Sequence, residues 1–126
     1  MLVDTDVFIW NFRGNTDAAD RLDALDGIKL SAVTYMELVQ GMRNKQELRD
    51  LRLALAHWDA EIIHIDEAIS SRAAFLVEQH YLSSGLRLAD ALIAATALDQ
   101  GETLLTANDK HYRLVDQLSL EVFRPG

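Results

Sequence analysis

MLVDTDVFI, residues 1–9, is the stretch of sequence that decides the fold. Leu2-Val3 predicts a short buried strand, and the apolar residues from Val7 to Trp10 predict a helical turn directly after it. A strand that passes at once into a helix is the repeating unit of α/β proteins with a parallel sheet. Asp4 therefore falls at the carboxyl end of a strand, the edge at which open α/β sheets gather their sites.

The same alternation of strand and helix continues along the chain. It predicts an α/β fold with one domain over residues 1–126, in which a short central parallel sheet of about four to five strands is flanked by helices on both faces. Gly27, Gly85 and Gly101 are expected to end helices, and Asp66 is expected to cap one. Further strands are expected at 28–33, 62–65, 103–106 and 121–123, and helices at 16–26, 34–41, 46–58, 67–83, 88–100 and 109–115.

Composition excludes several classes of protein. The absence of cysteine excludes disulfides and cysteine-based zinc sites, which fits an intracellular protein. The longest nearly apolar run, Ala89 to Leu98, falls far short of the roughly 20 residues of a membrane span. No basic leader precedes the first strand, so no signal peptide is expected. The net charge of −8 is unfavourable for binding nucleic acid unless bound metal neutralises some of the acids.

Four acidic or amide positions follow strands or lie on the helices after them. They are Asp4, Glu37 in LSAVTYMEL, Asp90 in RLADALIAATAL, and the pair Asn108-Asp109 in TLLTANDKHY. Carboxylates that converge at one sheet edge make a pocket for a hard divalent cation, as in many phosphoryl-transfer enzymes.

Each of these positions also has a purely structural interpretation. Asp4 and Asp6 could cap the helix that follows them, and Glu37 could be a solvated helical residue. Asp90 lies on an apolar helical face, where an unpaired carboxylate is costly, yet an acid in a first helical turn is also favourable. Asn108 and Asp109 are common turn residues. The four histidines have no metal-ligand spacing.

Taken together, the motifs resemble those of the PIN-domain family, and within it the VapC-like toxins of prokaryotic toxin–antitoxin systems. The resemblance covers essentially the whole chain, with VDTDVFIW followed by RGN, SAVTYMELVQG, LADALIAATAL and LLTANDKHY as its four motifs in order. It implies a PIN-like fold and an endoribonuclease that hydrolyses RNA phosphodiester bonds with Mg²⁺, for which Mn²⁺ can substitute.

Carried over by position, the resemblance makes Asp4, Glu37 and Asp90 both catalytic residues and metal ligands. Many family members have aspartate where this chain has Asn108, so either Asn108 or its neighbour Asp109 is expected to complete the catalytic set. The supporting residues are Thr5, Asp6 and Thr106, and the basic residues expected to steer RNA are Arg43, Lys45, Arg49 and Arg87.

The resemblance also implies partners and a location. A VapB-like antitoxin would place a basic tail in the acidic pocket, and the toxin would form a homodimer or a larger toxin–antitoxin assembly in the cytoplasm. The RNA substrate could be transfer, ribosomal or messenger RNA. Three alternatives stay open: a PIN-fold binding module without catalysis, a haloacid-dehalogenase-type phosphatase that uses Asp4 as its nucleophile, and a response-regulator-like receiver.

Overall fold

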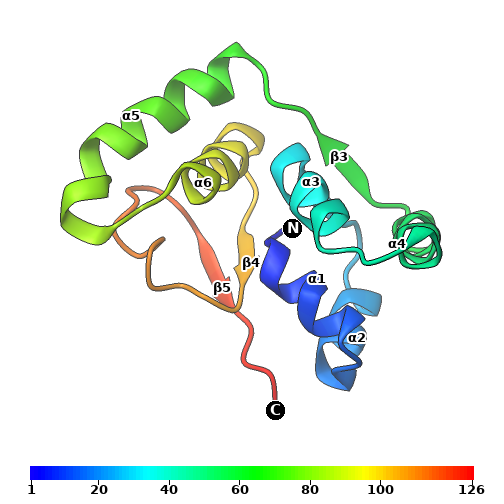
Figure 1. The fold of residues 1–126 in the computed structure, drawn as a ribbon. Coiled ribbons are helices and arrows are strands. Elements are labelled where there is room, and N and C mark those ends of the chain that lie inside the picture. Colours follow the sequence, from blue (N-terminus) through cyan, green and yellow to red (C-terminus); the bar gives the residue numbers. More distant parts are fainter.

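A computed structural model describes all residues from 1 to 126 as five strands and six helices. Strands and helices alternate along most of the chain, as the hydrophobic pattern predicts (Figure 1). None of the helices has the length and apolar character needed to cross a membrane. The elements are β1 (Leu2–Val3), α1 (Thr5–Phe12), α2 (Thr16–Asp23), β2 (Lys29–Ser31), α3 (Ala32–Gln40), α4 (Lys45–His57), β3 (Glu61–Ile63), α5 (Glu67–Ser84), α6 (Leu88–Gln100), β4 (Leu104–Thr106) and β5 (Leu120–Val122).

The five strands form one parallel sheet in the order β3-β2-β1-β4-β5. The shortest strand, β1, lies at its centre, where Leu2 pairs with Lys29 of β2 on one side and with Leu104 of β4 on the other. The predicted α/β class and the short parallel sheet are therefore confirmed. Because all strands are parallel, their carboxyl ends share one edge, and the residues that follow β1 and β4 become neighbours.

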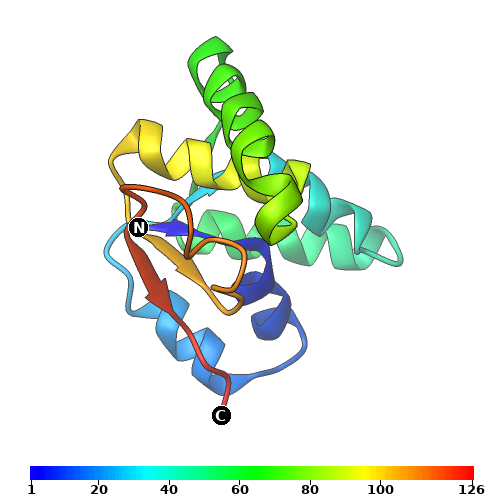
Figure 2. The same ribbon diagram turned by 90° about the vertical axis from the view of Figure 1, so that its left-hand side faces the viewer.

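Helices cover both faces of the sheet, as predicted. Successive side chains of a strand point to opposite faces, so Leu2 and Leu104 pack with α5 and α6, whereas Val3 and Leu105 pack with the other helices. Figure 2 shows α5 and α6 above the strands and α2 below them. The acidic positions therefore lie where a strand end emerges between two packed layers.

Several predicted boundaries are wrong by a few residues. α2 ends at Asp23 rather than Asp26, because the next amide, that of Leu25, donates to the carbonyl of Leu22 three residues back instead of continuing the helical pattern. Gly27 therefore lies in the turn before β2, at a φ of 119°. β2 ends at Ser31, whose hydroxyl accepts a hydrogen bond from Val33 N–H at 3.1 Å and so starts α3 two residues earlier than expected.

The predicted helix at 109–115 is also wrong, since this segment forms a series of turns. The amides of Tyr112 and Arg113 both donate to the carbonyl of Asp109, and Val115 donates to Tyr112, but the pattern does not continue. By contrast, Asp66 caps α5 and Gly85 and Gly101 end α5 and α6 in the left-handed conformation, as expected.

Candidate functional site

Asp4 is the buried centre of the site. It follows β1 directly and is 7% exposed. Its Oδ1 accepts a hydrogen bond from Thr5 N–H at 2.8 Å, so it caps α1, and its Oδ2 accepts one from the Thr106 hydroxyl at 2.8 Å. Thr106 ends β4, the neighbouring strand. The structural and functional interpretations of Asp4 are thus compatible, because capping uses only one of its oxygens.

Asp6 lies beside Asp4 and faces the same strand end. Its Oδ2 accepts hydrogen bonds from the amide of Ala107 at 3.2 Å and lies 3.4 Å from the Thr106 hydroxyl. Its Oδ1 is buried without any hydrogen-bond partner. An unpaired buried carboxylate oxygen is costly, so a cation or water at this position would stabilise the folded protein.

The electrostatics of this pair are unusual. Burial and the nearby charge of Asp6 raise the pKa of Asp4 from its ordinary 3.8 to about 7. Burial also raises the pKa of Asp6. Two carboxylates that share a desolvated space resist ionising together, and a positive charge between them removes that resistance.

Glu37 reaches the site through Thr5. The Thr5 hydroxyl donates to Oε1 of Glu37 at 2.7 Å and lies 3.0 Å from the hydroxyl of Thr34. This contact joins the start of α1 to α3, because Ser31 starts α3 early enough to place Glu37 in its second turn. Glu37 is therefore brought to the first acidic motif, while its side chain stays partly accessible.

Asp90 enters from the first turn of α6. Its Oδ2 lies 3.4 Å from the amide of Arg87, so it helps to cap its own helix, and its Oδ1 lies 3.5 Å from the hydroxyl of Tyr112. Burial, together with the charges of Asp4 and Asp90, raises the pKa of Tyr112 well above its ordinary value. Tyr112 thus lies between the first and third acidic motifs. Sequence analysis missed it, because a buried tyrosine in this pattern resembles any other core aromatic residue.

In the fourth motif, the neighbours Asn108 and Asp109 have different surroundings. Asn108 is exposed, and its backbone N–H donates to the Thr106 hydroxyl at 3.1 Å. Asp109 accepts from Nε of Arg113 at 2.7 Å and from Arg124 at 3.1 Å. These contacts, led by that with Arg113, hold the pKa of Asp109 below its usual range. Its carboxylate is thus occupied by arginines, whereas Asn108 is open to solvent.

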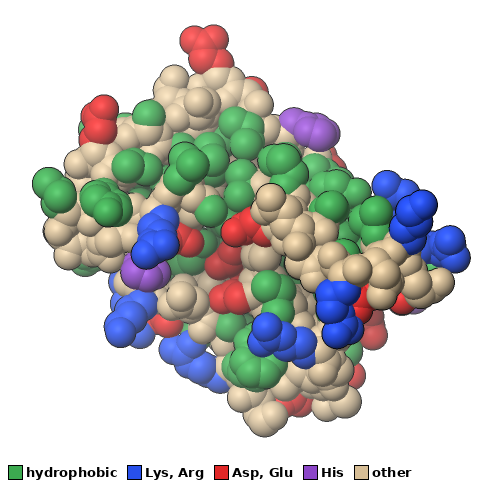
Figure 3. Space-filling view, viewed as in Figure 1, with side chains coloured by type: hydrophobic (Ala, Val, Ile, Leu, Met, Phe, Trp, Pro, Cys, Tyr) green, Lys and Arg blue, Asp and Glu red, His purple; other side chains and the backbone are tan.

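Basic side chains lie on several sides of the acidic centre. Figure 3 shows red acidic side chains gathered in the middle of the face, with blue basic side chains to the left, to the right and below them and green apolar side chains above. Arg87 adjoins Asp90, and Arg124 also donates to the carbonyl of Ala107 at 3.0 Å. Lys45 and Arg49 lie on α4, which α3 separates from α6 in Figure 1. The structure therefore places the backbone of Arg87 beside Asp90, does not bring Lys45 and Arg49 there, and adds Arg124, which pairs with Asp109.

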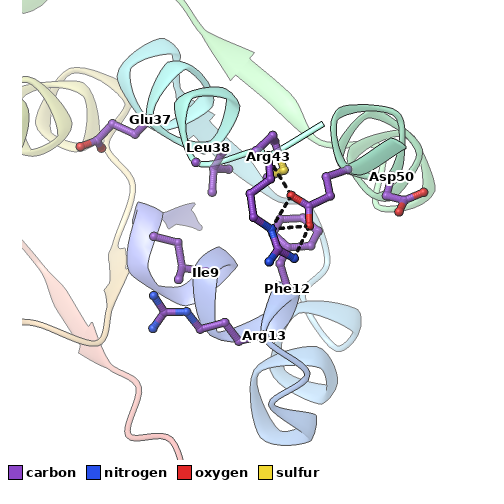
Figure 4. A pocket seen from close by; sticks show the side chains of 10 residues that line it. Ile9, Phe12, Arg13, Glu37, Leu38, Arg43 and Asp50 are labelled. Carbon is purple, nitrogen blue, oxygen red and sulfur yellow. Dashed lines mark hydrogen bonds and ion pairs between the residues drawn. The ribbon is translucent and has the colours of Figure 1, made fainter. Parts of the chain in front are cut away.

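A groove of about 550 Å³ runs beside the site between α1 and the α3–α4 connection. Its apolar side chains include Phe12 and Leu38, and its polar rim carries Arg13 and Arg43. Figure 4 shows Glu37 pointing away from Arg43, which is paired with Glu47 at 2.7 Å. Glu37 thus stands where the groove meets the acidic centre.

The donor chemistry of the centre fits a hard divalent cation. All candidate ligands are oxygens, which Mg²⁺ prefers, and the orphaned oxygen of Asp6 and the raised pKa of Asp4 both mark a shortage of positive charge. No three Asp, Glu or His side chains lie close enough together to hold a metal as they stand. The acids would therefore have to close around an ion by side-chain rotation.

Fold and site together define an α/β protein with an acidic centre at the carboxyl edge of a parallel sheet. Comparison with known families agrees with this description, since the PIN domain family matches residues 1–118. The chain belongs to the PIN-domain family. This membership sets aside the phosphatase and receiver families considered from the sequence.

Two curated relatives align over nearly their whole length. Ribonuclease VapC10 of Mycobacterium tuberculosis is 35% identical over 130 residues, which cover 100% of this chain and 96% of that protein. Ribonuclease VapC1 of Methanocaldococcus jannaschii is 29% identical, with 98% of this chain and 86% of that protein covered. The predicted resemblance to VapC-like proteins is confirmed.

Solved structures give the same result. A toxin–antitoxin complex from Klebsiella pneumoniae contains a chain with a TM-score of 0.79 and 30% identity, with 93% of each chain covered. FitAcB from Neisseria gonorrhoeae gives a TM-score of 0.72 at 26% identity, with 94% of each chain covered. VapBC2 from Rickettsia felis, at 22% identity, 98% coverage of each chain and a TM-score of 0.80, supports the fold alone.

Proposed function

We propose that this chain is a VapC-like endoribonuclease toxin that hydrolyses RNA phosphodiester bonds with Mg²⁺ and is inhibited by a cognate VapB-like antitoxin. The observation that carries the proposal is the meeting of three acidic motifs at one sheet edge. Asp4 is linked to the second motif through the Thr5–Glu37 hydrogen bond, and Tyr112 lies between Asp4 and Asp90. The names of the two ribonuclease relatives support the reaction class.

Asp4, Glu37 and Asp90 would hold the Mg²⁺, and Mn²⁺ could take its place. When bound, the cation would supply positive charge beside the scissile phosphate and make a water molecule more acidic. Thr106 would fix the orientation of Asp4 through their 2.8 Å hydrogen bond. Thr5 would hold Glu37 toward the site in the same way, and the exposed Asn108 would orient water or substrate.

Similar proteins whose structures were solved in complexes support the partners proposed for this chain. The Klebsiella pneumoniae neighbour comes from a toxin–antitoxin complex, which supports a VapB-like antitoxin for this chain. The groove beside Glu37 offers apolar and charged side chains at the entrance to the acidic centre, where a basic antitoxin tail could end. A toxin homodimer, a larger toxin–antitoxin assembly and a cytoplasmic location complete the proposal, with transfer, ribosomal or messenger RNA as substrate.

The decisive experiment compares matched variants on one helix. The purified chain, free of antitoxin, is incubated with total RNA in EDTA, in Mg²⁺ or in Mn²⁺. We expect discrete fragments only with metal, and their mapped ends would identify the target. Asp90→Asn should abolish cleavage, whereas Asp99→Asn, which removes the same charge from an exposed position of α6, should retain it. Cleavage by Asp90→Asn at the wild-type rate would contradict the assignment.

The alternative of a binding module without catalysis has one observation in its favour. Asp109 is occupied by two arginines, so no free carboxylate stands at the fourth position. Calorimetric titration with Mg²⁺ and Mn²⁺ separates the two functions. A module without catalysis should bind these ions weakly and cut no RNA, even when antitoxin is absent.

A further inference from the structure

Tyr112 is a buried polar group for which the proposed reaction has no use. Its side chain is 2% exposed and packs in the core beneath α5 and α6. A tyrosine that only filled space here would leave its hydroxyl without a partner, at a cost of a few kcal/mol. Instead the hydroxyl points to the acidic centre and lies 3.5 Å from Oδ1 of Asp90.

The same hydroxyl also faces the first acidic motif. It lies near enough to Asp4 to lower the pKa of that carboxyl, against the larger raising effect of burial, but its side-chain hydrogen bond is to Asp90. Burial and the charges of Asp4 and Asp90 keep the hydroxyl protonated, since they raise the pKa of Tyr112. One proton donor therefore stands between carboxylates from β1 and α6, two elements that the fold brings together from distant parts of the chain.

Asp90 has few other constraints. Its remaining hydrogen bond comes from the backbone amide of Arg87 at 3.4 Å, about the same length as the bond from Tyr112. Asp4, in contrast, is fixed by Thr5 and Thr106. Among side chains, only Tyr112 donates to Asp90, so its hydroxyl is the one side-chain contact that restrains this carboxylate.

The position of Tyr112 is itself held by the fourth motif. Its amide donates to the carbonyl of Asp109 at 3.0 Å, and the side chain of Asp109 is fixed by Arg113 and Arg124. Asp109, which is paired with the two arginines, therefore anchors the turn that carries Tyr112. Contacts within residues 109 to 124 thus hold Tyr112 in its position next to Asp90.

We propose that Tyr112 is a positioning residue whose hydroxyl orients the Asp90 carboxylate beside Asp4 and so prepares the two acids to bind a divalent cation. The inference rests on the proposed metal-dependent function. A group that orients metal ligands without touching the metal commonly changes affinity by about 10- to 100-fold when it is removed.

The test is Tyr112→Phe, which removes only the hydroxyl, with Tyr81→Phe as matched control because Tyr81 is exposed on α5. Mn²⁺ affinity of each metal-free protein is measured by calorimetry, and folding by circular dichroism and thermal unfolding. We expect the Kd for Mn²⁺ to rise about tenfold in Tyr112→Phe and to stay unchanged in the control. In an Asp90→Asn background, Tyr112→Phe should cause no further loss.

Each other outcome is informative. Unchanged or tighter Mn²⁺ binding by Tyr112→Phe overturns the proposal. So does a variant that fails to fold, because the hydroxyl would then support the core rather than the acids. If the wild-type chain itself binds no Mn²⁺ or Mg²⁺, the proposed function fails instead, and the two failures are thereby distinguished.

Discussion

Asp4 is the residue at which the fold and the chemistry of the site conflict most. It caps α1 and is buried, yet it must be ionised to hold a cation. Burial and the charge of Asp6 raise its pKa to about 7, so a large share of Asp4 is protonated at neutral pH in the metal-free protein. Ionisation of Asp4 and cation binding should therefore be coupled, so that metal binding releases protons.

A pH dependence of stability follows from this coupling. The folded-state pKa of Asp4, about 7, lies above its ordinary 3.8, so the folded protein holds this proton more tightly than the unfolded chain. The free energy of unfolding in EDTA should therefore be highest below about pH 4 with respect to this group, and should fall as the pH rises to 7. The slope is at most about 1.4 kcal/mol per pH unit.

Thermal unfolding in EDTA across this range, for wild type and Asp4→Asn, measures the effect of Asp4. The variant cannot ionise at this position, so its stability should fall less steeply with pH. Asp17→Asn, a change on the exposed surface of α2, is the control. Parallel curves for wild type and Asp4→Asn would contradict the prediction.

The acidic residues of the site could be predicted from the sequence, because each of them follows a recognisable apolar strand or lies near the start of a helix. Sequence could not divide the roles of Asn108 and Asp109, since the partners of Asp109 include Arg124, which lies far along the chain beyond β5. It also could not find Tyr112, whose importance depends on a contact across 22 positions with Asp90.

At the scale of elements, the signals that succeeded are local. Asp66 was expected to cap α5, and its side chain accepts from the amide of Ile69 at 2.9 Å. Alanine-rich α6 was predicted with its observed bounds, because Gly101 ends it and its apolar pattern is continuous. The segment after β4 does not form a helix because, apart from Arg113 to Asp109, its amides donate to carbonyls three residues back and the bonds do not form a continuous series.

The cap of α5 can be tested without disturbing the site. Asp66→Ala removes the hydrogen bond to Ile69 and should lower the free energy of unfolding by about 1 kcal/mol. Asp66→Asn keeps a side-chain oxygen that can cap and should lose much less. Urea titration of both variants measures the difference. RNA cleavage should be unchanged, because none of the hydrogen bonds of Asp66 reaches the acidic centre.

At the scale of the whole molecule, the basic side chains near the acidic centre contrast with the negative net charge of the chain. The chain carries a net charge of −8, yet basic side chains lie to the left, to the right and below the acidic centre in Figure 3. An acidic protein repels RNA at long range, so local arginines must provide the attraction. Arg13 lies in the groove beside Glu37, and Arg87 adjoins Asp90.

Neutralising these arginines should weaken RNA binding rather than catalysis. Arg13→Gln and Arg87→Gln should each raise KM and reduce the salt dependence of log KM by about 0.7 per lost phosphate contact. Arg52→Gln, on the exposed surface of α4, should change neither quantity. Cleavage rates measured at several salt concentrations decide the matter, and equal effects from all three variants would contradict a specific role for Arg13 and Arg87.

The central place of β1 has a consequence for how the protein is made. Leu2 pairs with Lys29 and with Leu104, so β1 gains its second partner only when a strand about a hundred residues later has been translated. Thr106, which orients Asp4, belongs to that same late strand. A nascent chain that has not yet released β4 therefore has no assembled acidic centre. The proposed RNA cleavage would then begin only after β4 has been translated and has joined the sheet.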